Sequence, residues 1–310
     1  MSAPPLFSRS ARASVASVGE EALIRRIRRW LGRASPPAPA GIGDDCAVLR
    51  PPRGRELLTV DPVVAGVHFD AATPPGAVGA KLIKRNLSDI AAMGGRPRAA
   101  VVSLALDGRV SLDWLARFYR GLASESRRWG VPVVGGDVTR ADGAFVATLA
   151  LTGEASGRFL ARSGARAGDW ICVTGRLGRS GPSGHHLRFT PRLAEGAWLA
   201  RRRSVRAMID VSDGLAKDLG SLTPAGAAPA VWASLLPRRP GASVREALCD
   251  GEDYELAFSV SAAGRAALER AWRRAFPRTR LTFIGRFVRA GAVPAGALPL
   301  GKFRGYEHLR

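Results

Sequence analysis

The stretch Val131-Pro132-Val133-Val134-Gly135-Gly136-Asp137 places a short apolar run directly before two glycines and an acid. Such a run predicts a buried β-strand over 131–134 that delivers Asp137 at a glycine turn. Apolar residues at helical spacing over 112–122 precede it and predict a helix that ends at Gly130, while residues 144–152 predict another strand. This succession of strands and helices predicts an α/β or α+β unit.

Similar apolar patterns predict helices and strands in the rest of the chain. Further helices are expected at 20–31, 78–93, 193–202, 244–248 and 263–274. Further strands are expected at 57–60, 99–106, 170–174, 254–260 and 281–287, with a strand-turn-helix over 208–219 and a strand near Val231. The Gly- and Arg-rich stretch 157–168 is the expected junction between two domains, 20–156 and 157–310, and residues 1–19 are expected to form a disordered tail.

Length and composition indicate a globular protein. With 310 residues, of which 46% are hydrophobic, the chain is long enough for two domains with sizeable cores. No run approaches the roughly 18 consecutive apolar residues of a membrane span, and the N-terminus lacks the apolar core of a signal peptide. Cys46, Cys172 and Cys249 lie far apart and form no Cys-x-x-Cys pattern, so neither a disulfide framework nor a zinc ribbon is expected. We therefore expect a cytoplasmic protein that does not enter a membrane.

The chain is strongly basic, with 47 Lys and Arg against 26 Asp and Glu and a net charge of +21. Such a balance is found in nucleic-acid-binding proteins. Only four of these cations are Lys, and the Arg residues are spread over most segments rather than gathered in one stripe. This distribution favours the composition bias of a GC-rich genome, so nucleic acid is not an expected partner. An Arg-rich nucleic-acid-binding protein stays as the alternative from a different class.

Acidic residues stand out against this background because they recur beside glycines and at the ends of apolar runs. They occur in Gly43-Asp44-Asp45, Val60-Asp61, Ser88-Asp89, Gly135-Gly136-Asp137, Asp210-Val211-Ser212-Asp213-Gly214 and Gly251-Glu252-Asp253. Each motif alone can be a turn or a helix N-cap. Together they predict a cation site, because like charges 4 Å apart repel by roughly 4 kcal/mol at an effective dielectric constant of about 20. Oxygen ligands favour Mg²⁺ over zinc or copper.

Common catalytic motifs are absent from the sequence. It contains no P-loop motif, no His-Glu-x-x-His motif and no Gly-x-Ser-x-Gly motif. Among the four histidines, His68 follows the strand-like run 63–67 near Asp61, which makes it the best candidate for a site residue.

Several longer motifs resemble the thiamine-monophosphate kinase family. They are Gly41-Ile42-Gly43-Asp44-Asp45-Cys46-Ala47-Val48-Leu49, Asp61 with Ala65-Gly66-Val67-His68-Phe69, Asn86-Leu87-Ser88-Asp89-Ile90-Ala91-Ala92-Met93-Gly94, Gly135-Gly136-Asp137-Val138-Thr139-Arg140, Arg162-Ser163-Gly164-Ala165, Ile209-Asp210-Val211-Ser212-Asp213-Gly214-Leu215 and Gly251-Glu252-Asp253-Tyr254-Glu255-Leu256. The resemblance runs from about Val18 to the C-terminus, and the motifs agree with the family in order and approximate spacing.

The resemblance implies the fold shared with aminoimidazole ribonucleotide synthetase. In that fold two α/β domains face a cleft and the N-terminal domains pair into a homodimer. The implied reaction is the phosphorylation of thiamine phosphate by ATP to give thiamine diphosphate, the last step of thiamine diphosphate synthesis. Residues 20–156 would then bind ATP and Mg²⁺, and residues 157–310 would bind the substrate and its phosphate.

The family's functional positions carry over to this chain one residue at a time. The implied Mg²⁺ ligands are Asp45, Thr59, Asp61, Asp89, Asp137, Asp210 and Asp213. The implied ATP contacts are Gly136, Asp137, Arg162 and Ser212, and the implied substrate contacts are His68, Glu252 and Phe303. Asp137, Asp210 and Arg162 would act in catalysis, whereas Asp44 and Asp253 are expected to be structural.

The absence of an obvious catalytic base agrees with this chemistry. The acceptor would be a phosphate oxygen, which is largely ionised at neutral pH because its second pKa is near ~6. Catalysis would then depend on in-line positioning and on charge neutralisation by Mg²⁺ and Arg162.

Two alternatives within the same fold stay open. Val60 stands where the family usually has Thr, Asp250 replaces the first Gly of a Gly-Gly-Glu-Asp-Tyr motif, and the stretch 175–192 is shorter than usual. These differences leave a non-catalytic copy as one alternative. Another is an aminoimidazole ribonucleotide or selenophosphate synthetase, against which the motifs at 210–215 and 251–256 argue.

Overall fold

The computed structural model describes residues 4–307, and the chain folds into two compact units. Unit 1 comprises the described residues up to Leu87 together with Arg96–Ser156. Unit 2 comprises Ser88–Gly95 and the described residues from Gly157 onward. The short segment Ser88–Gly95 therefore belongs to unit 2 although unit 1 precedes and follows it in the chain.

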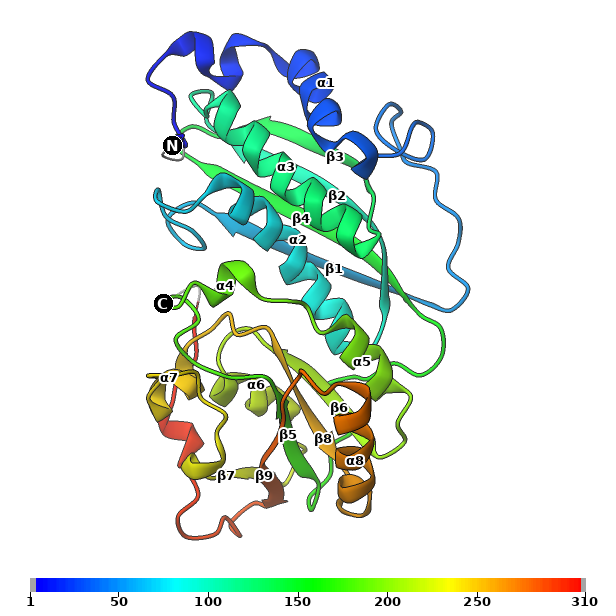
Figure 1. Ribbon diagram of the computed structural model, residues 1–310, viewed down its shortest axis with the longest axis vertical. Helices are drawn as coiled ribbons and strands as arrows, with labels where there is room; N and C mark the ends of the chain where they lie inside the picture. Colours follow the sequence, from blue (N-terminus) through cyan, green and yellow to red (C-terminus); the bar gives the residue numbers. More distant parts are fainter. Residues whose placement is uncertain (1–3, 308–310) are drawn as a thin grey trace. The chain divides into compact units, whose positions relative to one another are not determined.

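The strands of unit 1 form a mixed sheet in the order β1-β4-β2-β3 (Figure 1). The strands are β1 (Arg55–Val64), β2 (Arg96–Leu106), β3 (Val133–Arg140) and β4 (Phe145–Ala155). Strand β4 runs antiparallel to both β1 and β2, whereas β2 and β3 are parallel. Buried and half-buried residues alternate strictly along β4, as expected for a sheet with one covered face.

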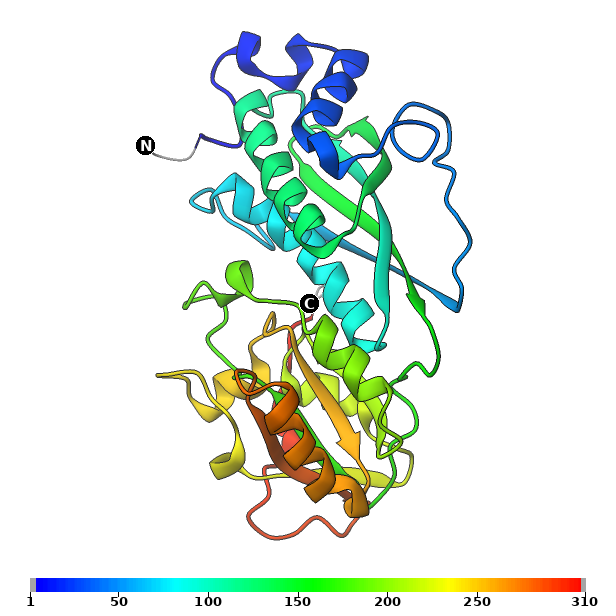
Figure 2. The ribbon, with the colours of Figure 1, turned by 45° about the vertical axis from the view of Figure 1, so that its right-hand side comes forward.

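Helices cover one face of this sheet (Figures 1 and 2). They are α1 (Glu20–Leu31), α2 (Pro75–Ala92) and α3 (Leu112–Trp129). Ser111 caps α3 by accepting a hydrogen bond from the Trp114 N–H, and Gly130 ends it in the left-handed conformation at φ 66°. The predicted bounds of α1 and α3 are thus confirmed, because amphipathic spacing and local end signals agree.

The N-terminal segment differs from the expected disordered tail. Two short 3-10 helices, Ala11–Ala13 and Val15–Ser17, follow one another here. Val15 is buried, and the Ala16 N–H donates to the Gly108 carbonyl at 3.0 Å. Polar composition suggested disorder, but pairing with the loop after β2 satisfies the backbone groups of this segment. Residues 1–3 lie outside the described residues.

Unit 2 is built on a second, fully antiparallel sheet in the order β6-β8-β5-β9-β7. Its strands are β5 (Trp170–Thr174), β6 (Val205–Val211), β7 (Ala227–Val231), β8 (Glu255–Val260) and β9 (Leu281–Arg289). Its helices are α4 (His185–Arg188), α5 (Leu193–Ala200), α6 (Leu215–Leu222), α7 (Val244–Cys249) and α8 (Arg265–Ala275). No helix within residues 4–307 is both long enough and apolar enough to cross a membrane.

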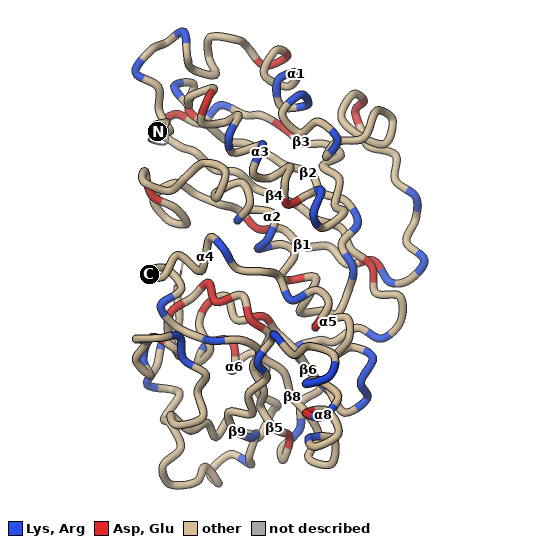
Figure 3. Tube along the Cα trace, in the orientation of Figure 1, with Lys and Arg blue, Asp and Glu red and all other residues tan. Residues whose placement is uncertain are grey.

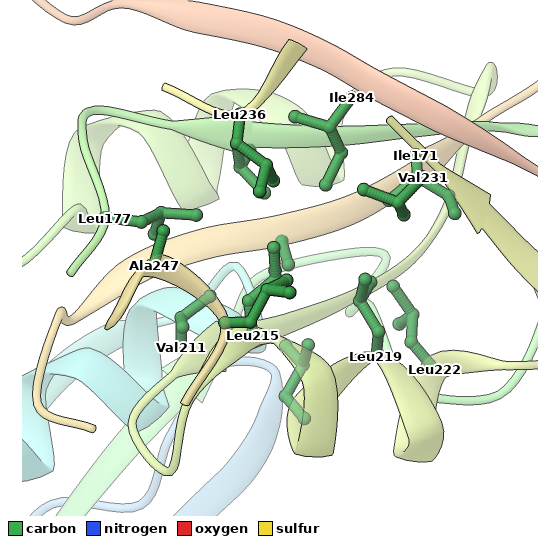
Figure 4. Packing of buried hydrophobic residues seen from close by; sticks show 14 of the residues in the cluster. Ile171, Leu177, Val211, Leu215, Leu219, Leu222, Val231, Leu236, Ala247 and Ile284 are labelled. Carbon is green, nitrogen blue, oxygen red and sulfur yellow. The ribbon is translucent and has the colours of Figure 1, made fainter. Parts of the chain in front are cut away.

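Both faces of the unit 2 sheet are buried. Ile171 and Ile209 contribute to one apolar cluster, together with Leu215 and Leu219 of α6 (Figure 4). The neighbouring strand residues Cys172 and Met208 contribute to the other, with residues of α5 and α8. The last turn of α2 joins this second cluster through Ala91 and Ala92. Alternate strand residues therefore face opposite helical layers.

Three of the predicted site residues lie inside strands rather than in turns after them. Asp61 is part of β1, Asp137 of β3 and Asp210 of β6. The glycines before Asp137 do not end the strand, because Gly135 and Gly136 pair with Val101 and Val102 of β2. The expected glycine turn before Asp137 was therefore wrong. Glycine is also required where the backbones of two strands approach closely, and the sequence alone does not distinguish this case from a turn.

Close packing of α2 on α3 supports the unit 1 core. A Cβ on Gly79 would lie 2.0 Å from the carbonyl oxygen of Phe118. We predict that Gly79→Ala lowers the free energy of unfolding by about 1–3 kcal/mol, because the helices must separate. Thermal unfolding followed by circular dichroism measures the change. Gly220→Ala in α6 is the control, since nothing lies within 4 Å of its added Cβ; equal losses in both variants would contradict the packing argument.

Candidate active site

Strand β3 presents Gly136 and Asp137 at the edge of the unit 1 sheet. A Cβ on Gly136 would lie 2.0 Å from the Val102 carbonyl oxygen, so only glycine fits here. Asp137 is exposed, and Thr139 Oγ1 donates a hydrogen bond to its Oδ2 at 3.0 Å. Because Gly136 has no side chain to cover the strand, a phosphate group or hydrated ion can approach the backbone and carboxylate at this point.

A small, mostly apolar hollow of about 80 Å³ adjoins Asp137. Its walls come from α1, α3 and the strands β2 and β3, and they are Ile24, Ile27, Leu31, Ile42, Val102, Tyr119, Val133, Gly135, Gly136, Asp137 and Val138. Burial raises the pKa of the Tyr119 hydroxyl, which therefore stays protonated. The sequence predicted no site role for Tyr119, because its helical spacing is that of an ordinary core residue.

Thr59 and Asp61 lie two residues apart on β1 and so share one face of the sheet. Arg85 of α2 reaches Asp61, with Nη2 3.4 Å from Asp61 Oδ1, and it also donates through Nη1 to the Pro62 carbonyl. Arg85 is buried, so its charge acts on Asp61 in a region of low dielectric. This cation favours the ionised carboxylate that a metal ligand requires.

His68 is buried and held from two sides. Its Nδ1 accepts a hydrogen bond from the Val64 N–H at 3.1 Å, which places the ring proton of the neutral imidazole on Nε2. Lys81, which is fully buried, donates from Nζ to the His68 carbonyl at 2.7 Å. These two contacts fix the orientation of the imidazole ring.

The implied ligands of unit 1 do not converge on one point of this chain. The strand pairing aligns Asp61 of β1 with Gly136 of β3, through Leu149 and Val102 of the two strands between them. Aligned residues share a face of the sheet and the next residue points to the other face, so Asp137 lies on the opposite face from Asp61. Asp45 lies in the exposed segment before β1. Within residues 4–307, no three His, Cys, Asp or Glu side chains gather closely enough to hold a metal ion by themselves.

In unit 2 the structure brings Asp210 together with the turn that carries Asp89. Asp210 is only 3% exposed, and Ser88 Oγ donates to its Oδ2 at 2.7 Å. Ser88 and Asp89 belong to the last turns of α2, within the part assigned to unit 2. The predicted ligands Asp89 and Asp210 are therefore neighbours through Ser88.

Two loops of unit 2 are joined by backbone hydrogen bonds. The Glu252 N–H donates to the Ser212 carbonyl at 2.7 Å, and the Tyr254 N–H donates to the Val211 carbonyl at 2.8 Å. Glu252 and Tyr254 adopt left-handed φ angles of 64° and 51°, which side chains other than glycine rarely adopt. This strained backbone holds the predicted substrate residue Glu252 against the predicted ATP contact Ser212.

Asp253 has a structural environment, as expected. It is fully buried, its carboxylate pairs with the buried Arg239, and it accepts a hydrogen bond from the Gly178 N–H at 3.1 Å. Removing either partner of such a pair would leave an uncompensated buried charge.

Asp218 of α6 supports the loop that carries Ser212 and Asp213. Its Oδ2 accepts hydrogen bonds from the Ser212 N–H at 3.1 Å and from the Asp213 N–H at 3.2 Å. Burial raises the pKa of Asp218 to about 7, the Asp213 charge adds to this, and the Arg162 guanidinium opposes it. The sequence showed Asp218 only as a polar residue of a helix, so its role was missed.

Arg162 borders a hollow of about 660 Å³ in unit 2. The Met208 N–H donates to the Ala161 carbonyl at 3.1 Å, which attaches the Arg162 segment to β6. Gly164 turns this segment at φ 122°, where a Cβ would lie 2.7 Å from the Arg206 carbonyl oxygen. The guanidinium is thus presented beside a space large enough for a phosphate.

The two C-terminal aromatic residues have different surroundings. Phe303, the predicted substrate contact, packs half-buried against the apolar cluster that includes α6. Tyr306 is 46% exposed, and its N–H donates to the Asp213 carbonyl at 2.8 Å. Within the described C-terminal residues, Tyr306 is therefore the more accessible ring.

Acidic residues of unit 2 gather in one region. Figure 3 shows red segments close together between α4 and α6, while blue segments are spread over the rest of the unit. Asp213, Glu252 and Asp253 belong to two loops that are hydrogen-bonded to each other, and Asp210 lies near the end of β6, just before the first of these loops. An arrangement of this kind suits a site for cations that accompany phosphate groups.

Comparisons with known proteins identify the family of this chain. Residues 43–155 match the family model of the AIR synthase related protein, N-terminal domain. The thiamine-monophosphate kinase of Salmonella typhimurium is 37% identical over 282 residues, which cover 81% of this chain and 85% of that protein. The chain belongs to the thiamine-monophosphate kinase family.

Solved structures of the thiamine-monophosphate kinase family match nearly the whole chain. The crystal structure of the enzyme from Stenotrophomonas maltophilia K279a is 32% identical, with a TM-score of 0.72, and covers 91% of this chain and 95% of that one. AaThiL complexed with AMPPCP and TMP is 29% identical, with a TM-score of 0.69, and covers 94% of this chain and 97% of that one. The predicted fold and family are confirmed.

The raised pKa of Asp218 predicts a pH-dependent stability. Because the folded state keeps the proton up to about pH 7, the free energy of unfolding falls as the pH rises from about 4 to 7. Asp218→Asn keeps an acceptor oxygen and removes this titration, so its stability relative to the unmodified protein should rise over the same range. Calorimetric midpoints in EDTA measure the difference. Asp142→Asn, at an exposed site, is the control; a pH-independent difference for Asp218→Asn would contradict the assignment.

Proposed function

We propose that this protein transfers the γ-phosphoryl group of ATP to thiamine phosphate, giving thiamine diphosphate and ADP. The observation that carries the proposal is the match to AaThiL complexed with AMPPCP and TMP over 94% of the chain. The ordered acidic loops of unit 2 support it, because they supply the oxygen ligands that phosphoryl transfer requires.

The side chains would contribute positioning and charge rather than a base. The acceptor phosphate oxygen is already ionised to a large extent at neutral pH. Arg162 would neutralise charge that develops on the transferred group, and His68, whose ring is oriented by the hydrogen bond at Nδ1, would contact the substrate. Glu252, held in its strained conformation, would position the substrate.

The phosphates of the nucleotide would lie beside Asp137. The bare backbone at Gly136, which is exposed, would let them approach β3.

Mg²⁺ fits the residues that the family implies for it. Mg²⁺ usually keeps several waters and takes one or two carboxylates together with substrate phosphates. The separated carboxylates of this chain suit such ions and do not suit a cage made of protein ligands alone. Asp89, Asp210 and Asp213 in unit 2, and Asp45, Thr59, Asp61 and Asp137 in unit 1, would hold ions that screen the phosphates.

A homodimer would cover the open face of the unit 1 sheet. Leu58, Val60 and Val101 are 74%, 59% and 40% exposed, and Val60, Ala150 and Val101 are paired neighbours across three strands. An apolar row of this kind on a sheet marks an interaction surface. The three cysteines are free thiols, as a cytoplasmic location would require.

Turnover is the direct test of the activity. With ATP, thiamine phosphate and millimolar Mg²⁺, the protein should form thiamine diphosphate and ADP, measured by chromatography. Asp137→Asn and Asp210→Asn should each lower kcat/KM by about 100-fold or more, because a ligand to the phosphate-bound ions is lost. Asp113→Asn, on the exposed surface of α3, is the control. No turnover by the unmodified protein would refute the proposed function.

Leu58→Lys tests the dimer. A charge on this exposed apolar face cannot be buried without a partner, so this variant should be monomeric while the unmodified protein is dimeric. Sedimentation velocity distinguishes the two states. Val48→Lys, at a residue that is 65% exposed outside the sheet, should stay dimeric. A dimeric Leu58→Lys variant would place the interface elsewhere.

A further inference from the structure

Lys217, in the first turn of α6, joins the Asp213 loop to the C-terminal segment Phe303–Glu307. Its Nζ lies 2.8 Å from Asp213 Oδ2 and 2.9 Å from Glu307 Oε1, and it donates to the Tyr306 carbonyl at 2.8 Å. An ammonium group has three N–H donors, so these contacts use all of them.

The backbone of the C-terminal segment lies directly on the same loop. The Tyr306 N–H donates to the Asp213 carbonyl at 2.8 Å. A Cβ on Gly305 would lie 2.4 Å from that carbonyl oxygen and 2.7 Å from Lys217 Cβ. The C-terminal segment can therefore approach this closely only because residue 305 is glycine.

These contacts connect residues with different expected partners. Asp213 is an implied ion ligand and Phe303 an implied substrate contact, and Tyr306, which is 46% exposed, donates its N–H to the Asp213 carbonyl. Phe303 packs on the core, and the residues after it are exposed or half-buried. The ammonium of Lys217 adds three contacts to the backbone hydrogen bond between Tyr306 and Asp213 and so links the two parts.

We propose that Lys217 is a positioning residue that ties the C-terminal segment to the Asp213 loop and so completes the binding site for thiamine phosphate. The proposal rests on the proposed function. It assigns Lys217 an effect on substrate affinity through the segment, without contact between Lys217 and the reacting atoms.

Lys217→Met tests the link, because methionine keeps most of the side-chain volume and loses the charge. At saturating Mg²⁺, the KM for thiamine phosphate should rise about five- to tenfold, the size expected for the loss of two partly exposed ion pairs. The kcat and the KM for ATP should change less than about twofold. Lys217→Arg should restore the KM, since a guanidinium can bridge the same carboxylates.

Gly305→Ala tests the same contact from the other side. The added methyl group should lift the segment and raise the KM for thiamine phosphate in the same way. Gly301→Ala is the matched control, because nothing lies within 4 Å of its Cβ. Equal KM values for both alanine variants would overturn the proposal.

Trypsin cleavage after Arg304 provides a readout that does not depend on activity. Release of the C-terminal peptide, followed by mass spectrometry, should be several-fold faster in Lys217→Met than in the unmodified protein. Unchanged cleavage would show that Lys217 does not hold the segment, and faster cleavage with an unchanged KM would show that the segment is outside the substrate site. Either result overturns the proposal. If cleavage is faster in the variant but the unmodified protein shows no turnover, only the proposed function is refuted.

Discussion

The antiparallel pairing of β6 with β8 continues beyond the ends of both strands, and the unit 2 site depends on it. Within the sheet, Asp210 pairs with Leu256 and Val211 with Glu255. Beyond the strand ends, two more backbone hydrogen bonds continue this pairing. The Tyr254 N–H donates to the Val211 carbonyl, and the Glu252 N–H donates to the Ser212 carbonyl. A backbone ladder of this kind sets the positions of both loops through main-chain groups alone. Left-handed φ angles at two residues other than glycine are the cost of this continuation.

Charge in the interior of unit 2 is stabilised in several ways. Asp210 accepts a hydroxyl hydrogen bond from Ser88, Asp253 pairs with Arg239, and Asp213 pairs with Lys217. The partner of Asp210 is a neutral hydroxyl group, whereas the buried pair with Arg239 satisfies Asp253 internally. The pair at Asp213 is partly exposed, so solvent screens it. The three acids thus differ in their partners although their sequence settings are similar.

The sequence predicted the elements well and their tertiary surroundings less well. The apolar periodicity of α1 and α3 and the residues that mark their ends lie within the same short segments, so the bounds of both helices follow from local sequence. The glycines before Asp137 were interpreted as a turn, because sequence does not show that Val102 of a distant strand lies against Gly136. The hollow at Tyr119 and the support from Asp218 were missed for the same reason: each depends on which residues meet after folding. The ion ligands, ATP contacts and substrate contacts implied by the family stay predictions, although the structure places Asp89 beside Asp210 and Glu252 beside Ser212.

Helix α2 has a consequence for how the protein could be divided. It begins in unit 1, yet its last turns supply Ser88 to Asp210 and two alanines to a unit 2 core cluster. A cut between Ser156 and Gly157 would therefore leave one fragment with an exposed apolar helix end, and the other with an unfilled core and without the Ser88 hydrogen bond to the buried Asp210. Each unit is compact by itself, but neither is continuous in sequence. A truncated chain or a gene fusion that carries only the C-terminal half of the chain would therefore need another segment in place of the last turns of α2.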